Sequence, residues 1–137
     1  MWWFYALLSA FFAALTAILA KIGVQQINSN LATAIRTAVV LVLAWAIVLA
    51  RGEQAGLTSV SQKTILFLIL SGVGTGLSWI CYFKALQLGK ASLVAPIDKS
   101  SLVMVLILAA IFLGEPMSAK AICGALLIVG GMIVLVI

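Results

Sequence analysis

Apolar residues are gathered into five long runs along the chain, and polar residues lie between these runs. The runs cover residues 2–20, 31–50, 64–83, 91–113 and 121–137. A helix that crosses a membrane needs about 20 mostly apolar residues, and each run is close to that length. A spanning helix satisfies its own backbone hydrogen bonds in lipid. The pattern therefore predicts an all-α integral membrane protein with five transmembrane helices.

The connections between the runs are short and contain residues that favour turns. Asn28-Ser29-Asn30 precedes the second run, Gly52 follows it, and Gly114-Glu115-Pro116 follows the fourth. No connection can hold a soluble domain, so we predict a single five-helix domain over residues 1–137. The first run could also be a signal peptide, but Trp2-Trp3 has no basic segment before it and is interpreted as an interfacial anchor.

Composition excludes a soluble protein and several kinds of chemistry. Apolar residues make up 66% of the chain and charged residues 8%, against about 50% and about 25% in soluble domains. The predicted surroundings are therefore a lipid bilayer. There is no histidine, and the two cysteines, Cys81 and Cys123, lie in apolar runs. We expect no metal, no cofactor and no catalytic residue, because no nucleophile–base pair or metal cluster can be assembled.

The formal net charge of +5 does not indicate nucleic acid, because the basic residues are scattered singly along the chain. Five spans place the two ends of the domain on opposite sides of the membrane. The connections carry three basic residues on each side: Arg51, Lys63 and Lys120 on the N-terminal side, and Lys21, Lys84 and Lys90 on the other. An excess of Lys and Arg normally sets the orientation. The balance leaves two hypotheses, one orientation set by a weak bias or insertion both ways (dual topology), and we favour the second.

Several short motifs follow one another in the second half of the chain. In order, they are Ala85-Leu86, Ala91, Ala95, Phe112-Leu113-Gly114-Glu115, Gly124, Leu127-Ile128 and Gly130-Gly131. Together they resemble the EamA repeat, which defines much of the drug/metabolite transporter superfamily. Ala95-Pro96-Ile97-Asp98-Lys99 is similar to the short branch of the family, which has a single five-helix repeat. The fourth run departs from many members, in which a proline lies nearer its middle, so substrate identity is not carried over.

The resemblance implies a transporter of small organic solutes. Long members contain two such repeats in opposite orientation around a central cavity, so this domain would be one half of a ten-helix inverted-repeat assembly. Transporters commonly bind their solute where such repeats meet. Two copies in opposite orientation would supply both walls, which predicts an antiparallel homodimer that works by alternating access.

Polar side chains recur at helical spacing in the third run. Ser71, Thr75, Ser78 and Tyr82 share one stripe, and Trp79 lies one turn beyond Thr75. We interpret this stripe as a cavity face that contacts the solute. The alternative is that each hydroxyl bonds to a carbonyl of its own helix. The first run offers a thinner stripe of Tyr5, Ser9 and Thr16.

Charged residues inside the predicted spans are hypotheses for a functional site, because they are costly in lipid. Arg36 lies in the second run, and Asp98 and Lys99 lie in the fourth. Since adjacent helix positions do not face one another, we expect Asp98 to pair with Arg36 rather than with Lys99. In the alternative, Arg36 and Lys99 reach the headgroups, and Asp98 caps a helix that begins near Pro96.

An excess of basic over acidic residues at this site suits an anionic or zwitterionic solute. The first three runs contain no acid that could exchange protons. The small multidrug resistance proteins, distant members of the superfamily, need such an acid, so we do not carry over their proton-coupled chemistry.

Small residues mark helix faces that can approach closely. Gly124 and Gly131 are seven residues apart in the fifth run, and this stretch resembles the dimer-forming last helix of the small multidrug resistance proteins. Packing against a second copy and packing within one protomer are both open. For Gly72 and Gly76 in the third run, packing within one protomer is favoured.

These observations predict a plasma-membrane (inner-membrane) transporter that moves a metabolite or a drug. The alternative is a lipid-carrier flippase or one subunit of a paired heteromeric membrane complex. An enzyme is disfavoured, since the sequence offers no residues for catalysis.

Overall fold

The computed structural model describes all 137 residues, and every regular element in it is a helix. Five helical stretches are long and apolar enough to cross a membrane, which confirms the predicted fold class. The chain divides into two compact units, Met1–Leu88 and Gly89–Ile137.

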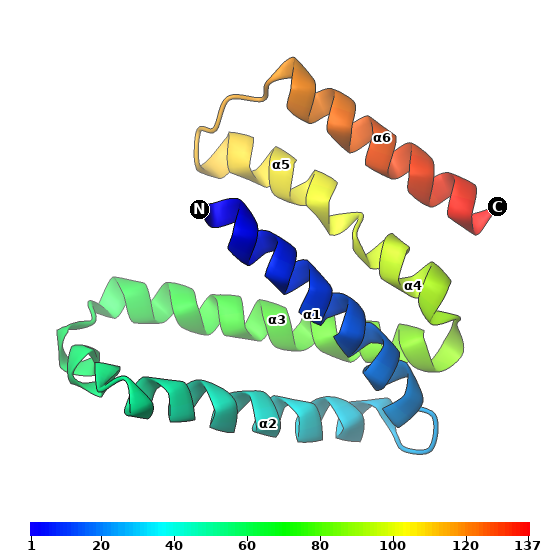
Figure 1. Ribbon diagram of the computed structural model, residues 1–137. Coiled ribbons are helices and arrows are strands. Elements are labelled where there is room, and N and C mark those ends of the chain that lie inside the picture. Colours follow the sequence, from blue (N-terminus) through cyan, green and yellow to red (C-terminus); the bar gives the residue numbers. More distant parts are fainter. The chain divides into compact units, whose positions relative to one another are not determined.

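The first unit contains α1 (Trp2–Gly23), α2 (Ser29–Ala50), the 3-10 helix η1 (Glu53–Ser59) and α3 (Gln62–Leu88). In this unit α2 and α3 run side by side in opposite directions, and α1 packs against α3 (Figure 1). Asn28 caps α2, because its side chain accepts a hydrogen bond from the N–H of Asn30. Gly52 reverses the chain after α2 with a φ of 69°, a left-handed conformation that glycine adopts easily.

The helices of this unit extend beyond the predicted runs. In α1 the helix continues past residue 20 to Gly23, and α3 continues past residue 83 to Leu88. The prediction stopped at the last residue of each apolar run. Polar side chains such as Lys84 remain helical, because they can reach toward the headgroups while the backbone keeps its hydrogen bonds. The short helix η1 was not predicted.

The buried residues of the first unit gather at the end where the α1–α2 turn meets the end of α3. They are Ala17, Val24, Ser29, Ala32, Thr33, Phe83 and Leu86. Hydrogen bonds from two side chains join this end of α1 and the turn after it to the end of α3. Lys21 Nζ donates to the carbonyl of Leu86 at 2.6 Å, and Gln87 Nε2 donates to the carbonyls of Val24 and Ile27 at 3.2 and 3.0 Å. The last carbonyls of a helix and those of the turn after it lack helical donors, and these side chains supply donors there.

The second unit contains α4 (Ala91–Asp98), α5 (Ser101–Phe112) and α6 (Ala119–Val136), and α6 packs against both other helices (Figure 1). Here the prediction of one continuous helix over 91–113 was wrong. Pro96 has no N–H to donate, and a tighter turn follows it, in which Ser100 N–H bonds to the Ile97 carbonyl at 2.9 Å. The two segments still form one span, Ala91–Phe112.

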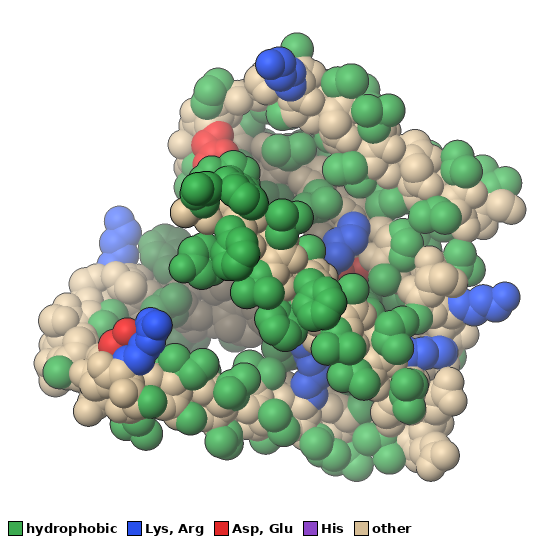
Figure 2. All heavy atoms as spheres, in the orientation of Figure 1, with side chains coloured by type: hydrophobic (Ala, Val, Ile, Leu, Met, Phe, Trp, Pro, Cys, Tyr) green, Lys and Arg blue, Asp and Glu red, His purple; other side chains and the backbone are tan.

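Apolar side chains are spread over the visible surface, and charged side chains are few (Figure 2). Phe112 is 77% exposed and Leu126 66% exposed. No residue of the second unit is buried. Soluble proteins do not expose apolar surface on this scale, so lipid or other protein must cover these helices.

Candidate functional site

Arg36 lies seven residues after the start of α2, about 10 Å along the helix axis. Its guanidinium carbon is 4.1 Å from the centroid of the Trp79 ring and 5.5 Å from that of Phe83, both on α3. Tyr82 lies three residues after Trp79 on the same helix. A guanidinium is attracted to an aromatic face, most strongly where water is excluded. The aromatic side chains therefore hold Arg36 against α3.

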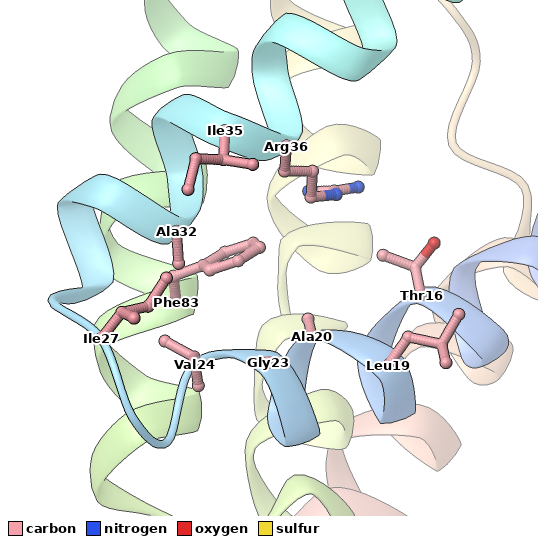
Figure 3. Close-up of a pocket in the computed structure, with 10 residues that line it drawn as sticks. All are labelled: Thr16, Leu19, Ala20, Gly23, Val24, Ile27, Ala32, Ile35, Arg36 and Phe83. Atoms are coloured by element: carbon pink, nitrogen blue, oxygen red, sulfur yellow. The ribbon is translucent and has the colours of Figure 1, made fainter.

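A cavity of about 360 Å³ opens beside Arg36, between the helices of the first unit (Figure 3). Its walls are mostly apolar, and Arg36 and Thr16 supply its charged and hydroxyl groups. Figure 3 shows the Arg36 side chain on α2 and Thr16 across from it on α1, with the ring of Phe83 beneath Arg36. The other lining residues are Leu19, Ala20, Gly23, Val24, Ile27, Ala32 and Ile35. Small side chains among them leave room for a ligand.

Arg36 has no carboxylate partner within the first unit. The one acid of this unit, Glu53, lies beyond the far end of α2, where its Oε1 is 3.6 Å from Nη1 of Arg51. The guanidinium of Arg36 thus keeps its N–H donors for another group. A carboxylate or phosphate oxygen is the acceptor that such a planar fork binds most strongly.

The predicted polar stripe of α3 divides into two parts. Trp79 and Tyr82 lie near Arg36, so the structure brings these three predicted residues together. Ser71, Thr75 and Ser78 are exposed, and the Thr75 hydroxyl donates to the Ser71 carbonyl at 2.9 Å. The alternative interpretation, in which a hydroxyl bonds to a carbonyl of its own helix, therefore holds for Thr75. Each hydroxyl that donates in this way can still accept a hydrogen bond.

Asp98 and Lys99 lie at the break between α4 and α5. Their side chains form an ion pair, with Asp98 Oδ2 3.5 Å from Lys99 Nζ. The expectation that these neighbours would not pair was wrong, because it assumed a continuous helix, whereas Lys99 follows the end of α4. The capping alternative was also wrong, since α4 begins at Ala91 and Asp98 is its last residue. The pairing of Asp98 with Arg36 concerns both units and stays a prediction.

The glycines singled out in the sequence have open space beside them. A methyl group built on Gly124 or Gly131 of α6 would meet no atom within 4 Å, and the same is true of Gly72 and Gly76 of α3. Close packing inside their own units therefore explains none of them.

The sequence pattern did not identify Phe83, Lys21 or Gln87 as important positions. A signal for Phe83 was present, because it follows Trp79 by four residues and so shares its helix face. Lys21 and Gln87 left no comparable signal, because they bond to backbone carbonyls, which every sequence has.

Five long apolar helices define a multi-pass membrane protein. The chain belongs to the EamA-like transporter family, whose model matches residues 1–137. It is 51% identical over 136 residues to "Uncharacterized transporter in cobO 3'region" from Sinorhizobium sp, a match that covers 99% of this chain and 96% of that protein. No solved structure was found to match. The resemblance to the EamA repeat is thus confirmed, and the protein is a membrane transporter.

Proposed function

We propose that the protein moves a small anionic or zwitterionic organic solute across the plasma membrane by alternating access. The observation that carries this proposal is Arg36, a charged side chain within a membrane span, stacked on Trp79 at the wall of a cavity. An ionisable residue inside a span is costly, and it usually marks a solute or ion pathway. Membership of a transporter family supports the same function.

The proposed working form is an antiparallel homodimer. Transporters commonly place the solute between two repeats of opposite orientation, and this chain matches one family model over its five spans. The equal number of basic residues in the connections on the two sides would let copies insert both ways. The open glycine face of Gly124 and Gly131 suits close approach of a second helix.

The test is uptake by vesicles that contain the purified chain alone. Solutes are first selected from a panel of anions, zwitterions and cations by the rise in melting temperature that they cause. Uptake of the selected solutes is then measured for the wild type, Arg36→Gln and Arg51→Gln. Arg51 is the matched control, because it is paired with Glu53 outside the cavity.

We expect saturable uptake that Arg36→Gln lowers by about tenfold or more, because a hydrogen bond to a charged group contributes about 1.5–3 kcal/mol. Arg51→Gln should transport like the wild type. Absence of saturable uptake would contradict the proposal for the isolated chain. In that case, movement of labelled lipid between the leaflets would favour the flippase alternative, and uptake restored by a second small membrane protein would favour the paired complex.

A further inference from the structure

The charge of Arg36 has no counter-ion in its own unit. The first unit holds a single acid, Glu53, and that carboxylate pairs with Arg51 at 3.6 Å. The stacking partners Trp79 and Phe83 stabilise a cation but carry no negative charge to neutralise it. An embedded cation of this kind is stabilised most by an anion that enters the cavity.

The stacking also decides which part of Arg36 a ligand can reach. The rings contact the guanidinium through its carbon, 4.1 Å from the Trp79 centroid, and aromatic rings accept no conventional hydrogen bond from its N–H groups. The single acid of the first unit, Glu53, is paired with Arg51 and does not occupy these groups. The N–H groups of a guanidinium are arranged as a fork, and two of them match the two oxygens of one carboxylate.

The rest of the cavity wall is chemically different from Arg36. Thr16 contributes one hydroxyl, and the remaining surface is formed by aliphatic and aromatic side chains such as Leu19, Ile35 and Phe83. A second charge on the ligand would therefore lie against apolar side chains without a partner, which is unfavourable. An uncharged apolar body would instead fill this part of the cavity favourably.

The space beside Arg36 suits a small occupant. About 360 Å³ is near the lower end of the range, about 300–1,000 Å³, that small-molecule pockets span. Small residues at Ala20, Gly23 and Ala32 provide this space, so the apolar body can be one ring or a short branched chain.

We infer that the cavity beside Arg36 binds monovalent carboxylates with a compact apolar body. Arg36 holds the carboxylate, Thr16 donates to or accepts from its polar end, and the aliphatic wall contacts the body. This inference names the solute class of the proposed transporter, and it rests on that proposed function only for its link to transport.

Binding is measured by calorimetry on the full chain in phosphatidylcholine nanodiscs with five matched probes. Benzoate has one carboxylate and a ring, benzyl alcohol and benzylamine keep the ring without the anion, acetate keeps the anion without the ring, and phthalate adds a second carboxylate. Benzoate should bind at least about tenfold more tightly than each of the other probes. The alcohol and the amine lack the carboxylate, acetate lacks the ring, and phthalate places a second charge against the apolar wall. Equal binding of benzylamine or benzyl alcohol would overturn the inference.

Variants assign the binding to this cavity. Arg36→Gln should raise the Kd of benzoate about tenfold to hundredfold, and Arg36→Lys should fall between, because an ammonium keeps the charge but not the fork. Arg51→Gln should bind like the wild type. An unchanged Kd in Arg36→Gln would overturn the inference.

A second measurement keeps the inference testable if the Arg36 variants do not fold. Replacement of Trp2, Trp3 and Trp45 by Phe leaves Trp79 as the one tryptophan, and Arg36 remains stacked on it. Benzoate should then change the emission of Trp79, whereas benzylamine should not. Binding of benzoate without such a change would place the ligand elsewhere and overturn the inference.

The two proposals can fail separately. Benzoate binding that depends on Arg36, without saturable uptake of any solute, supports the site and contradicts the transport mechanism. Uptake that depends on Arg36 but is confined to cations or uncharged solutes supports transport and overturns the assignment of the solute class.

Discussion

The two units of the protein use similar apolar helices, but they differ in how those helices are held. In the first unit, three helices meet around Phe83 and Leu86, which are 3% and 0% exposed, and Lys21 and Gln87 bond across this end. In the second unit no residue is buried, and α6 lies along a span that is broken after Pro96.

This difference shows what makes helices associate in lipid. Lipid tails are as apolar as leucine, so burial of apolar surface alone gives helices little reason to pack. In the first unit, buried side chains and hydrogen bonds between helices hold α1, α2 and α3 together, and an open cavity lies between them. The second unit keeps open faces on α6, such as those beside Gly124 and Gly131. We therefore expect the first unit to carry the solute site and the second to carry contacts with other protein.

The largest expected effect on stability is that of Phe83→Ala. Replacement of a buried phenylalanine by alanine costs about 3–5 kcal/mol in folded proteins. We expect a loss of about 3 kcal/mol for Phe83→Ala. The matched control, Phe112→Ala, should change little, because Phe112 is 77% exposed in the second unit. Unfolding in mixed detergent micelles measures both. Equal losses for the two variants would remove the contrast between the units.

A double-mutant cycle of Arg36→Gln and Asp98→Asn tests whether one site draws on both units. We expect Arg36→Gln to lower solute uptake by about tenfold or more and Asp98→Asn to lower it less, because Asp98 also pairs with Lys99. If both residues line one cavity, the double variant should be no worse than Arg36→Gln alone. Effects that simply multiply would show that the two residues act independently, which would contradict a shared cavity.

Gln87→Ala tests the closure of the first unit. Gln87 makes two hydrogen bonds to the carbonyls of the α1–α2 turn, and each contributes about 0.5–1.5 kcal/mol. We expect a stability loss of about 1–2 kcal/mol and no such loss in Gln26→Ala, a control on the same turn. Thermal unfolding of the two variants, measured side by side, compares their stability losses. If both melt like the wild type, the two bonds do not hold this end closed.

Gly131→Leu tests the open face of α6. We expect weaker dimers in membranes, measured by crosslinking, and an unchanged melting temperature of the protomer, because a Cβ atom added at Gly131 meets no atom within 4 Å. Gly130→Leu, one position away, is the matched control. A lower melting temperature with an unchanged dimer yield would assign Gly131 to packing within the protomer.

The smallest expected effect concerns the orientation in which the chain inserts into the membrane. With three basic residues in the connections on each side, reporters fused to the C-terminus should show both orientations. Lys120→Gln should shift the mixture toward a cytoplasmic C-terminus, and Lys90→Gln should shift it the other way. A signal from one orientation alone, unmoved by either substitution, would exclude dual insertion.

The spans could be predicted because they depend on local properties. A run of about 20 apolar residues is helical in lipid whatever its neighbours are, so residues 2–20 and 31–50 sufficed for α1 and α2. Helix ends were less certain, since polar residues such as Gln87 continue a helix where apolar periodicity has stopped. The broken fourth span followed from Pro96, whose missing N–H is visible in the sequence but whose effect depends on the turn that forms after it.

The sequence by itself determined the fold class, the family and the presence of one embedded arginine in the first three spans. Only the tertiary structure decided what surrounds that arginine. Trp79 and Phe83 come from another helix more than 40 residues away, and no local pattern states which faces of two helices will meet. The prediction that Asp98 would not pair with Lys99 was also wrong, because this ion pair depends on a break in the helix, which the residue spacing does not reveal. Spans follow from short-range hydrogen bonds and solvation, whereas sites follow from long-range packing.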